Sequence, residues 1–351
     1  MKKILFVAAS AILLAAGCQK TEILNQAAGD PMTFSTEMSK LTKAEPTEGD
    51  LNLRTQGFKV WAFAAYTDVI NNIKPGSVHD GMEAIPVTYK DKDNAWTTDL
   101  EYFWPSNENN LDFFALSTKV ANTVTIEGEG GNLGGRSMKV AGYTVDPTAA
   151  NDDLMVAQFI RQNSSMNGKK VELHFKHALS KVVFKFITNP TAVGETPATV
   201  VVKSLSIADL VTAGDLNVTE SDNATPDATT GNVTVSLLWT PTETAKGNFA
   251  DDHEDITLTT EPQTIATWLV IPQKLTDAEY TTDKTKCRKA TIEYTINNKP
   301  FNYTFNLPQG DVDSWGYNQI ITYTINLSPN KITFTPVVDD WTNTEIPEIA
   351  N

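Results

Sequence analysis

Cysteine is nearly missing from this sequence. Only Cys18 and Cys287 occur in 351 residues. If Cys18 is modified during export, no intrachain disulfide is possible in the mature chain. The stability of the fold must therefore come from buried apolar side chains and from hydrogen bonds between strands.

Positive charge is also scarce. The chain has 28 basic and 43 acidic residues, a formal net charge of −15, and no cluster of lysine and arginine. This charge would repel a phosphate backbone, which excludes nucleic acid as a partner. Apolar residues make up 40% of the sequence, enough for packed cores, and the length predicts two globular domains.

Motifs of catalysis and metal binding are missing as well. There is no G-x-S-x-G and no H-E-x-x-H motif. The glycine-rich stretch EGEGGNLGGRS, residues 127–137, lacks the ending of a phosphate loop and is interpreted as a flexible connection. The acidic stretch DDHED, residues 251–255, lacks the ligand pattern of an EF-hand and is interpreted as a solvated loop. We predict no enzyme activity, no catalytic residue, no cofactor and no metal.

Two of the four histidines, His174 and His177 in HFKH, are the pair most suited to bind a metal. On a helix they would share a face, but on a strand their odd separation places them on opposite faces. The flanking apolar residues, among them Phe175 and Leu179, predict a strand with His177 inward and His174 outward. Beyond Ser180 the apolar residues change face, which predicts a bulge or a break.

The N-terminal segment MKKILFVAASAILLAAGC contains two lysines, an apolar run too short to span a bilayer, and then small residues. It predicts a secretory signal of residues 1–17 that is cleaved between Gly17 and Cys18. The residues before Cys18 resemble a bacterial lipobox, with Ala15 where a leucine is usual. This resemblance implies a diacylated Cys18, and the glutamine that follows favours the outer membrane.

Residues 18–54 are mostly polar and acidic and are interpreted as a tether that carries one strand. In the stretch PMTFSTEM, the alternate residues Met32, Phe34 and Met38 lie on one side of that strand. The pattern changes in FKVWAFAAY, residues 58–66, where both alternating sets are apolar. Such a strand is expected to be covered on both faces.

The remainder of the chain consists of many short strand-like runs. They are rich in valine, threonine and aromatic residues and alternate with gaps of Gly, Asn, Asp and Pro. Residues 290–307 predict a hairpin, and only residues 276–287 could hold a helical turn or two. The polar stretch at residues 161–170 predicts a boundary between an N-terminal β-sandwich over 55–165 and a C-terminal one over 170–351. The predicted fold class is all-β.

Five tryptophans lie in or beside strand-like runs, and core or rim packing is expected for them. They are Trp61, Trp104, Trp239, Trp268 and Trp315. Exposed rings would instead bind sugars, so a glycan-binding surface lipoprotein that does not polymerise is an alternative function. A surface hydrolase is a second alternative, and it would need two carboxylates at catalytic spacing across a cleft.

The order of the strand-like segments resembles a known family. After the lipobox come MTFST, GFKVWAF, YFWPSNENNLDFFAL, HFKHALSKVVFKF, WLVIPQ, WGYNQIITYTINL and VVDDW. This series, which ends at about Trp341, is similar to the fimbrillin (FimA/Mfa-like) surface lipoproteins, subunits of type V pili. The resemblance implies two tandem transthyretin-like β-sandwich domains in an outer-membrane lipoprotein that is built into fimbriae. It also implies adhesion and assembly as the function, with other fimbrial subunits and a host or bacterial surface ligand as partners.

The same resemblance implies proteolytic processing. In the family an Arg-specific surface protease removes the tether and the first strand, and a strand of another subunit fills the groove that opens. Arg54 would then be the cleaved residue and Thr55 the new N-terminus. An unprocessed Arg54 and a cut at Lys43 are the alternatives.

The donated strand is harder to identify. Only ten residues follow Trp341, and their two isoleucines and one proline make a poor strand. Either KITFTPVV is donated, with Ile332, Phe334, Pro336 and Val338 on its pocket-filling side, or this subunit accepts a strand and donates none. The second case is expected of a fimbrial tip, whereas an anchor subunit would keep its lipid and escape cleavage.

Overall fold

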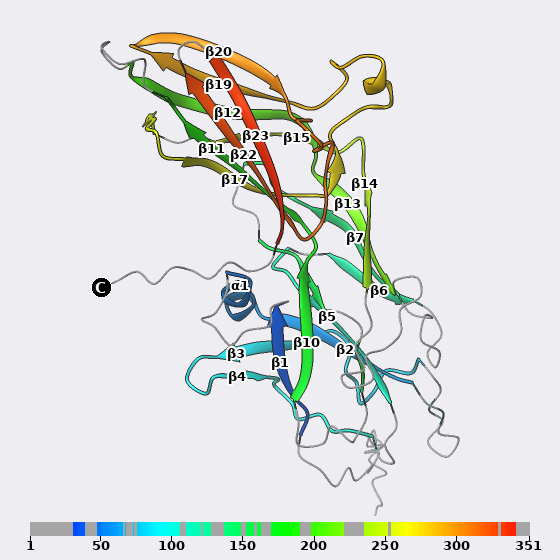
Figure 1. The fold of residues 1–351 in the computed structure, drawn as a ribbon. Coiled ribbons are helices and arrows are strands. Elements are labelled where there is room, and N and C mark those ends of the chain that lie inside the picture. The colour runs from blue at the N-terminus through cyan, green and yellow to red at the C-terminus, as the bar shows by residue number, and fades with distance from the viewer. Residues whose placement is uncertain are drawn as a thin grey trace, which may run out of the picture.

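The computed structural model describes residues 31–38, 48–65, 67, 73, 76–105, 110–120, 122–127, 137–148, 152–157, 160–162, 170–189, 198–220, 235–251, 254–328 and 331–341. Over these ranges the chain is built from strands, with one α-helix and one short 3-10 helix (Figure 1). The all-β prediction is confirmed. No helix in the described ranges is long and apolar enough to cross a membrane.

One half of the molecule is an eight-stranded sheet that closes on itself. Its strands are β1 (Thr33–Met38), β2 (Phe58–Ala64), β3 (Ile85–Lys90), β4 (Ala95–Thr97), β5 (Leu111–Ser117), β8 (Met155–Ala157), β9 (Ile160–Gln162) and β10 (Lys170–His177). They follow the order β2-β3-β4-β1-β10-β8-β5-β9, and β2 also pairs with β5. These pairings join all of these strands except β9 into a closed ring, in which β1 lies between β4 and β10.

Apolar side chains of the ring alternate inward, as the pleat of a strand requires. The ring of Phe58 on β2 lies 4.9 Å from that of Trp96, 5.3 Å from that of Phe175 and 6.3 Å from that of Phe34, between centroids. Each strand of the closed ring contributes at least one buried side chain to this cluster. The ring therefore encloses the core of this half.

A four-stranded sheet covers the outer face of β2 and β5. It consists of β6 (Thr123–Glu127), β7 (Ser137–Thr144), β13 (Ala213–Glu220) and β14 (Val235–Pro241), in the order β14-β13-β7-β6. Trp61 of β2 and Phe114 of β5 belong to one buried cluster with Met138 of β7. Both faces of β2 are therefore covered, as the sequence predicts.

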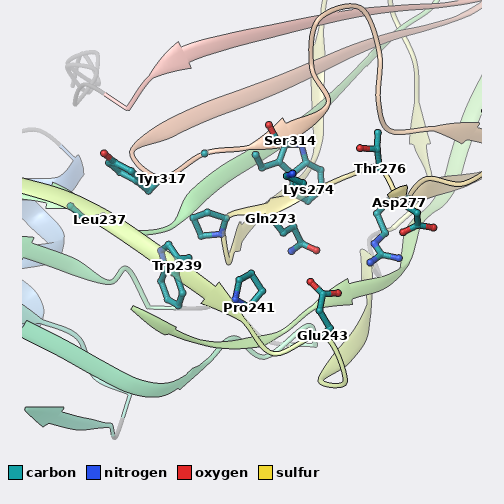
Figure 2. A pocket seen from close by; sticks show the side chains of 14 residues that line it. Leu237, Trp239, Pro241, Glu243, Gln273, Lys274, Thr276, Asp277, Ser314 and Tyr317 are labelled. Carbon is teal, nitrogen blue, oxygen red and sulfur yellow. The ribbon is translucent and has the colours of Figure 1, made fainter. Parts of the chain in front are cut away.

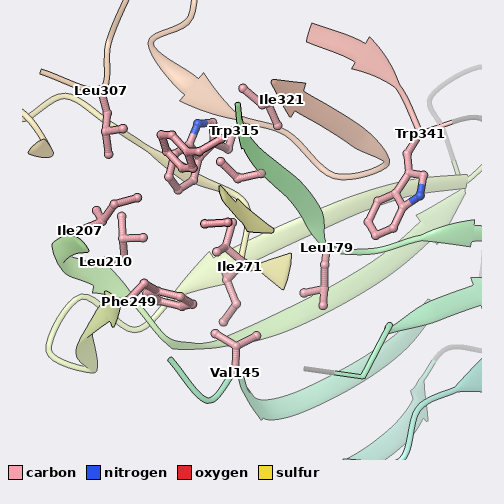
Figure 3. Close-up of a cluster of buried hydrophobic side chains, with 14 of the residues drawn as sticks. Val145, Leu179, Ile207, Leu210, Phe249, Ile271, Leu307, Trp315, Ile321 and Trp341 are labelled. Carbon is pink, nitrogen blue, oxygen red and sulfur yellow. The ribbon is translucent and has the colours of Figure 1, made fainter. Parts of the chain in front are cut away.

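The other half is a β-sandwich. One sheet, in the order β17-β11-β22-β23, consists of β11 (Ser180–Ile187), β17 (Gln263–Val270), β22 (Gln319–Ser328) and β23 (Lys331–Asp340). The facing sheet, in the order β15-β12-β19-β20, consists of β12 (Val200–Val211), β15 (Lys246–Asp251), β19 (Lys289–Ile296) and β20 (Lys299–Asn306), with β16 (Ile256–Thr257) beside β12. A short pair, β18 (Gln273–Lys274) and β21 (Ser314–Trp315), lies next to them. Figure 3 shows part of the core, where apolar side chains gather around Trp315.

The hairpin predicted over residues 290–307 is confirmed as β19 and β20. Asn297 and Asn298 form its two-residue turn with φ of 48° and 63°, a left-handed conformation that asparagine accepts more readily than most residues. A 3-10 helix, Ala278–Thr281, occupies the segment where the sequence allows a helical turn.

The chain passes between the two halves at Ala178 and Leu179. β10 ends at His177 in the closed ring and β11 begins at Ser180 in the sandwich, which confirms the predicted break. The strand pairings cross the boundary expected at residues 161–170, because β10 pairs with β1 and β7 pairs with β13. The two halves are therefore not divided at a single point near the polar stretch.

Residues 48–54, the last part of the segment interpreted as a tether, and the two residues after them form the α-helix α1 (Glu48–Gln56), which the sequence pattern does not predict. Its two leucines differ in environment: Leu51 is 40% exposed and Leu53 is fully buried. A single buried leucine gives no helical periodicity, which explains why the helix is missed. α1 lies beside β1 and β3 (Figure 1).

Candidate strand-exchange site

β1 fills a slot between β4 and β10. It pairs with β10 in parallel over all six of its residues. On its other side a single residue, Phe34, pairs with Trp96 of β4. The strand is therefore held along its whole length by β10 and at one point by β4.

Side chains from β1 and from the residue before it complete the core of the ring. Met32 is 5% exposed and Phe34 is 2% exposed. Full burial of such a side chain stabilises a fold by about 1.5–3 kcal/mol. Trp96 Nε1 donates to Thr36 Oγ1 at 3.1 Å, which adds a side-chain link between β4 and β1. The side chain of Met38, the third apolar residue predicted to be removed, lies outside the described residues.

Arg54 lies in the last turn of α1, and its guanidinium carbon is 4.6 Å from the centre of the Tyr89 ring on β3. The side chain is half-buried, so Arg54 is not an open surface charge. Thr55 is exposed, and its Oγ1 donates to Leu51 O at 2.8 Å within the helix. Proteolysis of a folded segment proceeds through its locally opened state, so a cut after Arg54 requires α1 to unwind.

The two residues that follow Thr55 are fixed to the ring. Gln56 Nε2 donates to Ser117 Oγ at 2.7 Å and to Asp153 O at 3.0 Å. Ser117 Oγ in turn donates to Gly57 O at 2.6 Å. A chain that begins at Thr55 would keep these bonds, so its new end would stay attached to β5.

Gly57 is required where α1 ends, and its substitution should be costly. Its φ is +68°, its N–H donates to Leu53 O at 2.7 Å, and a Cβ would lie 2.7 Å from Val87 O. We expect Gly57→Ala to lower the free energy of unfolding by about 2–5 kcal/mol, because the left-handed backbone and the clash with β3 add. Urea unfolding measures the change.

Gly81 supplies the matched control for this prediction. Its φ is +72°, but a Cβ there would meet nothing within 4 Å. Gly81→Ala should therefore cost only the backbone contribution of about 1–2 kcal/mol. Equal losses in the two variants would show that the contact with Val87 is unimportant.

β23 lies at the edge of the sandwich. It pairs with β22 over all ten of its residues, and no other described strand pairs with it. Its predicted pocket-filling side is divided, because Ile332, Phe334 and Pro336 are half-buried whereas Val338 is 42% exposed. The ring of Phe334 lies 4.6 Å from that of Phe305 on β20. β23 is thus a last strand held by one neighbouring strand and by a few half-buried side chains.

The end of β23 is fixed by Trp341 at the junction of the two halves. Its indole stacks on the His177 ring at 3.7 Å and 3° between planes, and the backbone N–H of Trp341 donates to Asn318 O at 2.6 Å. His177 Nδ1 lies 2.6 Å from Asp153 Oδ2, and both side chains are buried. The inward position predicted for His177 is confirmed, with His174 half-buried on the other face. Within the described ranges, no group of three or more His, Cys, Asp or Glu could hold a metal ion.

The tryptophans occupy core or rim positions, as predicted. Trp61, Trp104 and Trp315 are buried, and Trp239 and Trp268 are half-buried. The acidic stretch around residue 254 is described only in part, and its described residues are exposed or half-buried.

The remaining residues that the sequence indicates as candidates are the two cysteines, the residue before the first of them, and Lys43. Gly17, Cys18 and Lys43 fall outside the described residues. Cys287 is a half-buried free thiol, and burial raises its pKa. A thiol with a raised pKa is a poor nucleophile at neutral pH.

The structure also contains a cleft that the sequence does not reveal (Figure 2). Its volume is about 570 Å³, and its lining comes from segments 237–243, 272–277 and 314–317, together with Arg288. Because these segments are far apart in the chain, no local motif could indicate the cleft.

The described fold defines an all-β protein in which the first strand completes one core and the last strand ends at a sheet edge. A family model described as fimbrillin-like matches residues 42–341. The match spans most of the chain, and the protein belongs to the fimbrillin-like family. The resemblance found in the sequence is therefore confirmed.

A solved structure shares this fold, and a second is similar over most of its length. A fimbrial protein from Bacteroides vulgatus ATCC 8482 has a TM-score of 0.53 and 16% sequence identity, and the alignment covers 89% of this chain and 99% of that chain. A candidate cell adhesion protein from Bacteroides uniformis ATCC 8492 has a TM-score of 0.46 and 16% identity, with 89% and 98% covered. No curated protein matches the sequence.

Proposed function

We propose that this protein is a pilus subunit of the outer surface, exported as a lipoprotein through Cys18 and assembled by strand exchange. Its function is assembly and adhesion, without enzymatic activity. Cleavage after Arg54 removes β1 and most of α1 and leaves Thr55 as the N-terminus. A strand from another subunit then enters the slot between β4 and β10.

The proposal is based on the position of β1. β1 closes the ring and completes its core, yet Arg54 separates it in sequence from every other described strand. Its removal would expose the unpaired edge of β10 and the pocket that Met32 and Phe34 fill. An incoming strand would restore both the main-chain hydrogen bonds and the apolar burial.

β23 is the strand best suited to be donated. It has ten residues, against six in β1, and it is the last described strand of the chain. Ile332 and Phe334 repeat the two-residue spacing of Met32 and Phe34. Pro336 has no N–H to donate, which a strand tolerates where it lies at an edge.

The N-terminus and the intact mass of the native surface protein, measured with and without heating, test this proposal. We expect a chain that begins at Thr55 and runs as a ladder of polymers that heat dissociates. A monomer that begins at lipidated Cys18 would overturn the proposal. An anchor subunit or a non-polymerising glycan binder would then be the better description.

Unwinding of α1 should limit the rate of cleavage after Arg54. Leu53→Ala removes the buried leucine of the helix, and such substitutions cost about 2–5 kcal/mol in the docked state. The opened state then becomes more populated, so an Arg-specific protease should cut the variant at least about tenfold faster, the factor given by 1.4 kcal/mol. Mass spectrometry of timed digests measures this rate.

The exposed Leu51 of the same helix gives the control. Leu51→Ala keeps the helix propensity high and loses little burial, so its rate of cleavage should stay close to that of the unsubstituted protein. If Leu53→Ala were cut no faster than Leu51→Ala, opening of α1 would not be the limiting step.

A further inference from the structure

The cleft combines an aromatic end with a charged end. Figure 2 shows Trp239 and Tyr317 toward one end, Glu243 and Asp277 toward the other, and Gln273 between them. Its volume of about 570 Å³ lies within the range of about 300–1,000 Å³ that is usual for small-molecule sites. The cleft is therefore large enough for a ligand of a few rings.

Hydrogen bonds within the protein fix the apolar and amide parts of the lining. Trp239 Nε1 donates to Ala178 O at 2.7 Å. Gln273 Oε1 accepts from Val211 N at 2.9 Å, and its Nε2 donates to Ile271 O at 3.1 Å. These side chains are ordered before any ligand arrives, which lowers the entropy cost of binding.

The charged side chains of the cleft, by contrast, are not held by polar partners among the described residues. In the part of the chain that the structure describes, the side chains of Glu243, Lys274, Asp277 and Arg288 make no hydrogen bond or ion pair. Arg288 is half-buried and carries five N–H donors. Donors that are partly withdrawn from water without a protein acceptor favour a ligand that supplies oxygen atoms.

The balance of charge selects among such ligands. The cleft contains two acidic and two basic side chains, so its own charges cancel, and the whole chain carries −15. An anion therefore gains little there. A hydroxyl group donates to carboxylates and accepts from guanidinium or ammonium groups, so it can bind to both the acidic and the basic side chains of the cleft.

We propose that the cleft binds a neutral saccharide. The apolar face of a sugar ring would pack on Trp239 and Tyr317, as aromatic side chains offer an apolar surface of this size. Its hydroxyl groups would meet Arg288 and the neighbouring charged side chains. This inference adds a ligand class to the adhesive role in the proposed function and rests on that role only for its exposure at the cell surface.

Calorimetry on the full-length, uncleaved protein tests the inference. The probes are neutral di- and trisaccharides of hexoses and N-acetylhexosamines, each paired with a form that carries a uronic or sialic acid. We expect at least one neutral probe to bind more tightly than its acidic form. Arg288→Gln should weaken that binding about tenfold or more, because it removes a charged hydrogen-bond donor. Tyr317→Ala should weaken it to a similar extent, because it removes ring surface on which the sugar would pack.

Two substitutions on β20 serve as controls. Lys299→Gln and Phe301→Ala remove an exposed cation and an exposed ring away from the cleft and should leave binding unchanged. Lys274→Gln, an exposed residue of the lining, gives a cleft variant that should fold even if Arg288→Gln does not. Absence of binding to every probe, preference for the acidic forms, or equal binding by cleft and control variants would each overturn the inference. Polymer formation is measured separately, so failure of strand exchange is distinguishable from failure of saccharide binding.

Discussion

Replacing Arg54 with glutamine is expected to leave the surface protein at its full mature length, beginning at Cys18, and to abolish the heat-labile ladder of polymers. Glutamine lacks the charge that an Arg-specific protease recognises, yet it is a good helix former and should keep α1 intact. β1 would then stay in its slot beside β10, and no strand of another subunit could enter. Intact mass, N-terminal sequencing and gel migration with and without heating measure the effect.

The other candidate processing residue gives the control for this variant. Lys43→Gln should be processed and should polymerise like the unsubstituted protein. Polymers of Arg54→Gln that begin at residue 55 would show that recognition does not depend on arginine. If Lys43→Gln blocked polymer formation instead, the cut would lie at Lys43.

Replacing Trp341 with alanine is expected to free β23 and to lower the free energy of unfolding by about 3–5 kcal/mol, the usual cost of removing a buried tryptophan. The indole is 3% exposed and stacks on His177, so its loss removes the contact that ends β23 at the junction. Hydrogen exchange should show faster exchange of the amides of β23 than of those of β19. Processed protein with this substitution should also polymerise faster, because the donated strand leaves its own sheet more readily.

Trp268→Ala is the control for this prediction, because it should also lower the stability of the sandwich but removes no contact to β23. Trp268 lies on β17, at the opposite edge of the same sheet, and contacts Phe184 and Phe249. Trp268→Ala should destabilise the sandwich without selective exchange of the β23 amides. Unchanged protection of β23 in Trp341→Ala would mean that the stack on His177 does not hold the strand.

Local patterns in the sequence predict most of the strands, because alternation of apolar residues depends only on neighbouring positions. The hairpin at Asn297 and Asn298 and the inward side of His177 follow from such alternation, and the two covered faces of β2 follow from apolar residues at both alternating sets of positions. The break after His177 follows from the change of face at Ser180. Each of these features is decided within one short, continuous stretch of chain.

Features that depend on distant segments are not predicted. Nothing near Leu53 indicates that it is buried under the closed ring, so the helix α1 is missed. The pairing of β7 with β13 joins residues far apart in the chain, and the polar stretch at 161–170 gives no sign of it. The cleft at Trp239 is likewise formed by segments that meet only in the folded protein.

The slot of β1 and the strand β23 lie in different halves of the molecule (Figure 1). A contact in which β23 of one subunit occupies the slot of the next would therefore join two unlike surfaces. Such heterologous contacts repeat head to tail and generate open filaments when the rotation between subunits does not close a ring. Because the slot fixes the direction of a strand beside β10, every subunit would point the same way. The filament would then have a distinct growing end, and its length would depend on the supply of subunits.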